Sequence, residues 1–382
     1  MRKSKEICEQ KRIIKDNTVD CFSDIPYNIL LKILNLLPAE LLRYKYKYVC
    51  RRWFNLITNW ILFDQASLIV QKPSHGKHLY ETRLLDISEV RLKEFKLEMY
   101  EQVIDIPCRG RIRSWCNELL LIADTSEFGA LYIFNLITKE GFHLPQCLGS
   151  GDCGGHFRLK CGLVLTFDKF KRVYKVLHVV ITDELVLCEI LVSERNSLSF
   201  NHSKWKKIDG PAQIGERKYY WSDPVSVEGR FLHWDVNSAE YILSMDIIKE
   251  RFQETHLPEF GNGNSSLSTS YEFVERDGLL CLLHPISATQ VDMWILKDFH
   301  RAIWEKLQSI RSLSYLSAKI SLCKTHPVPL TFFKNGSIII FRKAGSEFGY
   351  FAYYLEYDRL VKLESGIKPD ECWLVQSKSL GF

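Results

Sequence analysis

Four residues that could bind a metal ion lie close together in the middle of the sequence, namely Cys147, Cys153, His156 and Cys161. Thiolate and imidazole groups are the usual ligands of structural zinc, and such sites commonly pair their ligands at a spacing of about two to four intervening residues. Only Cys153 and His156 meet that spacing, and the other cysteines are scattered singly along the chain. We therefore interpret the cysteines as reduced, mostly buried thiols and predict no metal site.

A glycine-rich stretch in the same region, Gly149-Ser150-Gly151-Asp152-Cys153-Gly154, fits the G-x-G-x-x-G pattern of dinucleotide-binding loops. Such a loop needs a buried strand before it and a helix after it, because the helix N-terminus binds the pyrophosphate. Here Leu144-Pro145-Gln146-Cys147 precedes the glycines and a strand-like segment, 156–167, follows them. The stretch therefore predicts a loop between two sheets, and we expect no cofactor.

Other catalytic motifs are missing from the sequence. It contains no G-x-S-x-G elbow, no phosphate-loop lysine motif and no H-E-x-x-H helix. Asp223, His233 and Asp235 are of types that act as general acids or bases, but their spacing does not bring them into one site. We predict that the chain is not an enzyme and has no catalytic residue.

Length and composition narrow the class of protein. The chain has 382 residues, of which 46% are hydrophobic and 25% charged, as is typical of a soluble globular protein with two domains or one large repeat-built domain. No apolar run approaches the roughly 18 residues of a membrane span, and no apolar core of a secretory signal follows Met-Arg-Lys-Ser-Lys. A net charge of +5 is too small to favour nucleic acid. We expect a cytoplasmic or nuclear protein with neither membrane nor nucleic-acid partners.

The segment 25–57 has the residue spacing of short helices. Ser23 or Asp24 can cap the first helix, Pro26 lies in its first turn and Pro38 ends it. Apolar residues on its face stand at 25, 29, 30, 33, 34 and 37, and a second set is Leu41, Leu42, Tyr48, Val49, Trp53, Leu56 and Ile57. These helices have more apolar surface than they can bury among themselves, which indicates a partner or packing against the rest of the chain.

From residue 66 onward, short apolar strings alternate with turn residues, which is typical of an all-β sandwich, barrel or propeller. The strings are 66–70, 119–123, 131–134, 163–167, 174–181, 185–190, 279–283, 293–296, 337–341 and 351–354. No helical segment of convincing length separates them, which argues against a parallel α/β fold.

A repeat underlies these strings. Each unit has two apolar strands followed by an aromatic residue shortly before a closing Leu or Ile, and the five units are 115–145, 161–208, 228–258, 276–307 and 334–363. Trp205, Phe252 and Trp304 close three units at intervals of about 50 residues, close to the period of propeller blades. Small sheets of this kind bury their faces by stacking around an axis. We expect roughly six or seven blades, with the strand at 66–70 helping to close the ring with the C-terminus.

The N-terminal segment resembles the F-box. The family pattern is Leu-Pro, a Leu/Ile-rich helix, a second Leu-Pro and then Val-Cys-Lys/Arg-x-Trp, and this chain has Ile25-Pro26, Leu37-Pro38 and Val49-Cys50-Arg51-Arg52-Trp53 at matching spacing. The resemblance implies docking on a Skp-family adaptor. The residues implied to pack or present that interface are Ile25, Pro26, Ile29, Leu30, Ile33, Leu34, Leu37, Pro38, Leu41, Leu42, Val49, Cys50 and Trp53.

The rest of the chain resembles the F-box-associated, kelch-like propeller of the large plant F-box family. The resemblance is carried by the order and spacing of short phrases, among them Cys116-Asn117-Glu118-Leu119-Leu120, Gly229-Arg230-Phe231-Leu232-His233-Trp234 and Gly278-Leu279-Leu280-Cys281. Together the two resemblances predict an α+β multidomain chain. Its parts are a flexible basic tail (1–20), an all-α F-box of about three helices (21–63), a linker or first strand (64–79) and the all-β propeller (80–382).

These resemblances imply a substrate-recognition subunit of an SCF-type cullin–RING ubiquitin ligase. The F-box would bind the adaptor, and through it the cullin and RING subunit, while loops at the propeller rim would bind a target protein for ubiquitination. The sequence does not identify the target or the substrate-binding residues. Two alternatives stay open, namely a propeller-fold enzyme with an N-terminal helical cap and an F-box scaffold that acts without a ligase.

Overall fold

The computed structural model divides into two compact units, Met1–Asp64 and Gln65–Phe382. The residues it describes are 25–26, 29–30, 33–34, 46, 49–56, 66–73, 80–89, 97–108, 110–124, 130–136, 138–147, 161–168, 170–181, 186–195, 197–211, 224–236, 238, 240–260, 271–287, 290–310, 328–333, 336–343, 349–364 and 374–377.

The predicted α+β class is wrong. In the first unit, the described residues contain one short helix, α4 (Arg51–Leu56), and helical positions at 29–30 and 33–34, so no all-α domain of three helices is seen there. Apart from these helical positions, every secondary-structure element in the described part of the chain is a β-strand. Short amphipathic helices take most of their stability from tertiary packing, so apolar spacing alone does not establish a helical domain.

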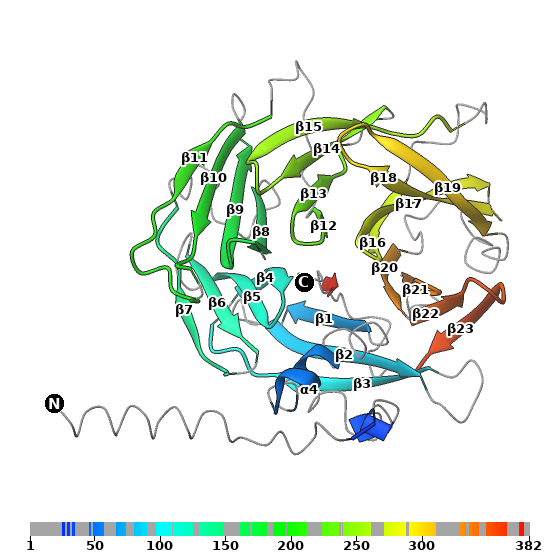
Figure 1. Ribbon diagram of the computed structural model, residues 1–382, viewed down its shortest axis with the longest axis horizontal. Helices are drawn as coiled ribbons and strands as arrows, with labels where there is room; N and C mark the ends of the chain where they lie inside the picture. Colours follow the sequence, from blue (N-terminus) through cyan, green and yellow to red (C-terminus); the bar gives the residue numbers. More distant parts are fainter. Residues whose placement is uncertain are drawn as a thin grey trace. The chain divides into compact units, whose positions relative to one another are not determined.

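The second unit is a six-bladed β-propeller, with six four-stranded sheets arranged in a ring (Figure 1). Blade 1 holds β24 (Leu374–Ser377), β1 (Ala66–Pro73), β2 (Tyr80–Glu89) and β3 (Leu97–Ile104). Blade 2 holds β4 (Gly110–Cys116), β5 (Leu119–Asp124), β6 (Leu131–Asn135) and β7 (Gly141–His143). Blade 3 holds β8 (Cys161–Asp168), β9 (Val173–Ile181), β10 (Val186–Val192) and β11 (Lys206–Ile208).

Blades 4 to 6 follow in the same order. Blade 4 holds β12 (Val225–Val227), β13 (Phe231–Trp234), β14 (Tyr241–Asp246) and β15 (Arg251–His256). Blade 5 holds β16 (Glu272–Arg276), β17 (Leu279–Ser287), β18 (Gln290–Asp298) and β19 (Ile303–Ile310). Blade 6 holds β20 (Val328–Phe333), β21 (Ile338–Lys343), β22 (Gly349–Tyr354) and β23 (Arg359–Leu363). Each blade is an antiparallel meander whose first strand lies nearest the axis, apart from blade 1 (Figure 1).

Burial along the strands follows from this arrangement. Every residue of β5, β14 and β22 is buried, because a strand in the middle of a blade packs against neighbouring blades on both faces. The outermost strands are polar and largely exposed, as in β15, where only Thr255 is fully buried. The apolar strings in the sequence are therefore the inner strands, and the polar segments between them are outer strands and turns.

Six separate apolar clusters fill the six interfaces between adjacent blades. One joins blades 1 and 2 around Trp115, another joins blades 3 and 4 around Trp234, and a third joins blades 6 and 1 around Leu68 and Tyr350. The remaining clusters join blades 2 and 3, 4 and 5, and 5 and 6. Because every interface is packed, the ring is closed.

Closure depends on blade 1, whose strands come from both ends of the unit. β24 lies nearest the axis and pairs antiparallel with β1, with Leu68 opposite Ser377 and Gln71 opposite Leu374 (Figure 1). The expectation that the strand at 66–70 helps to close the ring with the C-terminus is confirmed.

Candidate functional site

The N-terminal segment separates its apolar residues into a buried pair and an exposed pair. Leu30 and Leu34 are fully buried, whereas Ile29 and Ile33 are 41% and 37% exposed. Residues four apart lie on the same side of a helix, so each pair is a short stripe. The backbone N–H groups of Ile29 and Leu30 donate to the carbonyl of Pro26 at 3.0 Å, which begins the helical geometry at this proline.

The Val-Cys-Arg-Arg-Trp string has the same division. Val49 is 46% exposed, whereas the side chain of Trp53 is buried and its ring lies edge-on to Tyr46, with centroids 6.3 Å apart. The backbone N–H of Trp53 donates to Sγ of Cys50 at 3.4 Å, so this half-buried thiol caps the first turn of α4. The exposed apolar residues of this segment are therefore Ile29, Ile33 and Val49.

The other residues predicted for the adaptor interface are placed less completely. Ile25 is half-buried and Pro26 is exposed. Leu37, Pro38, Leu41 and Leu42 lie outside the described residues. The prediction for these four positions is therefore untested.

On the propeller, one surface is formed by the turns that join the first two strands of blades 3 to 6. These inner turns follow β8, β12, β16 and β20. They contact one another in sequence around the ring, because a Cβ at Gly278 would lie 3.1 Å from Oε1 of Glu228, and one at Gly336 would overlap the guanidinium of Arg276. Gly278 and Gly336 have φ values of +75° and +73°, which favour glycine.

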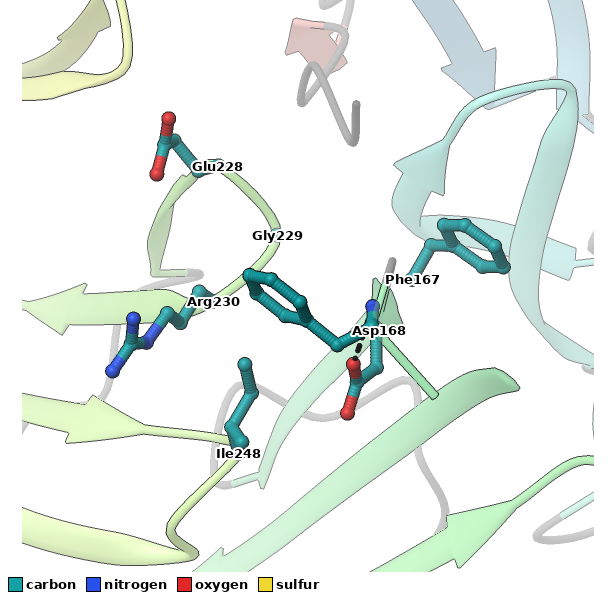
Figure 2. Close-up of a pocket in the computed structure, with 7 residues that line it drawn as sticks. Phe167, Asp168, Glu228, Gly229, Arg230 and Ile248 are labelled. Atoms are coloured by element: carbon teal, nitrogen blue, oxygen red, sulfur yellow. Dashed lines mark hydrogen bonds between the residues drawn. The ribbon is translucent and has the colours of Figure 1, made fainter. Parts of the chain in front are cut away.

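A small pocket opens on this surface between blades 3 and 4 (Figure 2). Phe167 and Asp168 line it from the end of β8, Arg230 lines it from the opposite turn, and Ile248 comes from the turn between β14 and β15 (Figure 2). Glu228, Gly229 and Phe170 complete the lining. Its volume is about 60 Å³, far below the roughly 300–1,000 Å³ of a typical small-molecule site.

Two charged groups that line the pocket, Arg230 and Asp168, are paired. Nη2 of Arg230 donates to Oδ2 of Asp246 at 3.0 Å, and Nζ of Lys175 lies 3.3 Å from Oδ2 of Asp168. Burial raises the pKa of Asp168, but hydrogen bonds from the N–H of Lys171 and the charge of Lys175 outweigh it and lower the pKa below its ordinary value. A carboxyl group with a lowered pKa is a poor proton acceptor at neutral pH. This carboxyl group is therefore poorly suited to acid–base chemistry.

Phe170 gives this surface an apolar feature. It is 69% exposed at the tip of the turn between β8 and β9, whereas Asp168 holds that turn by accepting hydrogen bonds from the N–H groups of Phe170 and Lys171 at 3.1 and 3.0 Å. An exposed aromatic ring on a rigid turn is typical of a protein-binding residue. The sequence predicted rim loops as the target-binding elements without naming residues, and that prediction is untested.

Of the acid–base residues noted in the sequence, His233 and Asp235 lie in the described part of the chain and have separate hydrogen-bond partners. His233 is completely buried, its Nδ1 lies 2.8 Å from the hydroxyl of Ser244, and burial lowers its pKa to about 3. Asp235 accepts a hydrogen bond from the hydroxyl of Tyr271 at 3.1 Å. Asp223 and the glycine-rich stretch 149–154 lie outside the described residues.

No helix in the described part of the chain is long and apolar enough to cross a membrane.

Residues 81–368 match the family described as the F-box associated beta propeller domain. The chain belongs to this family. Among its relatives are two Arabidopsis thaliana F-box proteins. F-box protein At5g49610 is 25% identical over 75% of this chain and 78% of its own length. F-box protein At3g07870 is 22% identical over 75% of this chain and 72% of its own length.

The solved structures that resemble this F-box-associated propeller are more distant from it. A catalytically inactive virginiamycin B lyase from Staphylococcus aureus is 10% identical, with a TM-score of 0.41 over 81% of this chain and 87% of its own. A similarity this weak supports no inference about activity.

Proposed function

We propose that this F-box-associated propeller protein is the substrate-recognition subunit of an SCF-type cullin–RING ubiquitin ligase. The observation that carries the proposal is an exposed apolar stripe next to a buried one in the segment that resembles the F-box, in a chain whose second unit belongs to the F-box-associated propeller family. Exposed isoleucines cost free energy in water unless a partner covers them. The adaptor implied by the family is the partner that fits.

Within this proposal, Ile29, Ile33 and Val49 contact the Skp-family adaptor directly, whereas Leu30, Leu34 and Trp53 hold the segment in shape. Burying one aliphatic side chain contributes roughly 1.5–3 kcal/mol. Three such residues can therefore supply several kcal/mol of binding free energy before the entropic cost of association. The adaptor would bring the cullin and the RING subunit.

The target would bind at the inner-turn surface of blades 3 to 6. Its exposed Phe170 and its paired charges at Arg230 and Asp246 offer an apolar anchor with a polar surround, the usual composition of a protein-binding site. This chain would make and break no bond itself. It would raise the local concentration of target lysines near the charged ubiquitin-conjugating enzyme.

The test is co-purification of the full chain with the adaptor. We expect the double change Ile29→Asp and Ile33→Asp to abolish recovery of adaptor and cullin, because two carboxylates would be buried in an apolar interface. Tyr100→Asp is the matched control, since Tyr100 is 59% exposed on the outer strand of blade 1 and should not affect recovery. Full recovery with the double variant would exclude this interface. If the parent protein recovers the adaptor without cullin, the result would favour a scaffold that acts outside a ligase.

A further inference from the structure

Three potential metal ligands of different chemistry meet where blade 2 leads into blade 3. Cys147 lies in the connection that follows β7, and His178 and Glu189 are opposite each other on β9 and β10. One ligand atom from each lies within 4.8 Å of the other two. We propose that Cys147, His178 and Glu189 bind a zinc ion.

The ligand types fit zinc better than other biological cations. A thiolate and an imidazole select Zn²⁺ over Mg²⁺ and Ca²⁺, which prefer oxygen donors. Bond lengths of about 2.0–2.3 Å to zinc place tetrahedral ligands roughly 3.3–3.8 Å apart. The longest separation here, at most 4.8 Å, needs a contraction of about an ångström, and the 2.7 Å between Nδ1 of His178 and Oε1 of Glu189 needs a widening of roughly 0.6 Å. A water molecule would complete the tetrahedron.

Burial also favours an ion at this place. The exposed fractions of Cys147, His178 and Glu189 are only 4%, 0% and 3%. A carboxylate this deeply buried needs compensation by a cation or by hydrogen bonds. A thiolate, a carboxylate and a neutral imidazole carry two negative charges, which one Zn²⁺ ion neutralises.

The surroundings hold the imidazole in place. Nδ1 of His178 lies 2.7 Å from Oε1 of Glu189, so the ion would replace the proton between these two atoms and bind both residues directly. Trp205 packs edge-on against His178, with centroids 6.1 Å apart, and its indole N–H donates to the carbonyl of Pro145 at 2.8 Å. One side chain thus fixes both the imidazole and the connection that carries Cys147.

Blade 4 provides an internal comparison. His233 on its second strand faces Ser244 on its third, in the same arrangement as His178 and Glu189 in blade 3. There Nδ1 of His233 lies 2.8 Å from the Ser244 hydroxyl, which also accepts a hydrogen bond from Thr255 at 2.8 Å. Hydroxyl groups are sufficient to satisfy a buried histidine in this fold. The carboxylate and thiol in blade 3 are therefore not required by the propeller architecture.

The experiment is a metal analysis of the purified full chain after removal of any affinity tag. We expect about one zinc ion per chain by inductively coupled plasma mass spectrometry. Competition with a chromophoric chelator should show at least a tenfold lower zinc affinity for Cys147→Ser and for Glu189→Gln. After replacement of zinc by cobalt, the parent protein should show a thiolate-to-cobalt charge-transfer band that Cys147→Ser lacks.

The matched control is Cys188→Ser. Cys188 is also 4% exposed and adjoins Glu189, but it belongs to the cluster between blades 3 and 4 and not to the ligand group. It should keep its zinc and its cobalt band, and circular dichroism should show all variants folded. A parent protein without stoichiometric zinc or a cobalt–thiolate band would overturn the proposal. Equal loss of metal in the Cys147 and Cys188 variants would overturn it as well.

Discussion

The ammonium group of Lys175 lies 3.3 Å from the carboxylate of Asp168, and the two side chains are only 2% and 0% exposed. Nζ of Lys175 also donates to the carbonyl of Ile247 at 3.1 Å, so this lysine joins an ion pair within blade 3 to the backbone of blade 4. Such a group is costly to bury alone but specifies how two blades meet. It lies beneath the pocket that we propose as part of the target surface.

Lys175→Met should lower the free energy of unfolding by about 3 kcal/mol, because it leaves the Asp168 carboxylate buried without its cation. Urea-induced unfolding monitored by tryptophan fluorescence measures this. Lys206→Met is the control, since Lys206 also bridges blades 3 and 4, through Glu250 at 2.7 Å, but is 66% exposed. It should cost less than about 1 kcal/mol. Adding Asp168→Asn to Lys175→Met should recover stability, and a further loss of similar size would contradict the ion-pair explanation.

Gly278→Ala should destabilise the propeller by about 1–2 kcal/mol. The residue has a φ of +75°, and a Cβ would lie 3.1 Å from Oε1 and 3.3 Å from Cγ of Glu228 in the neighbouring turn. Gly162→Ala is a matched control, because the nearest atoms to its Cβ would be 3.7 Å away and its φ is not positive. Differential scanning calorimetry should show a lower melting temperature only for the first variant. Equal melting temperatures for the two variants would mean that the turns carrying Glu228 and Gly278 do not pack against each other as described.

Glu275 should make the stability of the protein depend on pH near neutrality. Burial raises its pKa to about 7, with a smaller contribution from the charge of Asp277. Between about pH 4 and pH 7 the folded state therefore keeps a proton that the unfolded state has released, so stability falls as pH rises through this window. Above pH 7 the full penalty remains.

Unfolding free energies measured at several pH values should show this fall in the parent protein and a flatter profile in Glu275→Gln. Glutamine keeps the acceptor for the N–H of Gly278, which Glu275 binds at 2.7 Å. Glu356→Gln changes an exposed glutamate and should leave the profile of the parent unchanged. An identical slope in the Glu275 variant would show that another group is responsible.

Phe170→Asp should weaken target binding by about tenfold or more, because a buried aromatic anchor contributes well over 1 kcal/mol to an interface. Proximity labelling with the Ile29→Asp/Ile33→Asp background would keep targets bound and undegraded. Proteins enriched with that background should be lost with Phe170→Asp and kept with Tyr100→Asp. Loss in both variants would argue against the inner-turn surface.

Much of the propeller was visible in the sequence because its signal is local. The five repeat units each correspond to one blade, since a buried strand needs a continuous apolar string such as 119–123 in β5. Blade 1 matches none of the repeat units, because one of its strands comes from 374–377 and three come from 66–104. A sheet whose strands come from both ends of the propeller unit does not occur in the sequence as one continuous repeat.

The sites were less predictable, because they join residues through space. The apolar spacing of 25–37 marked Ile29, Leu30, Ile33 and Leu34 alike, and only burial separates the exposed pair from the buried one. Likewise, short sequence spacings around Cys147 point to Cys153, His156 and Cys161, whereas its neighbours in space, His178 and Glu189, lie on strands of the next blade. The pairing register of β9 and β10 places His178 opposite Glu189, and this register cannot be predicted from the sequence of one repeat unit.

Because Leu68 pairs with Ser377, the ring stays open while the ribosome makes the chain. During that time the inner edge of β1 has no strand beside it, and an unpaired edge is a site for aggregation. The entropic cost of the final closure grows only slowly with the length of the intervening chain, so the last strand can still find its place. A transcript that ends before Leu374 would therefore encode five complete blades and a sixth that lacks the strand needed for closure.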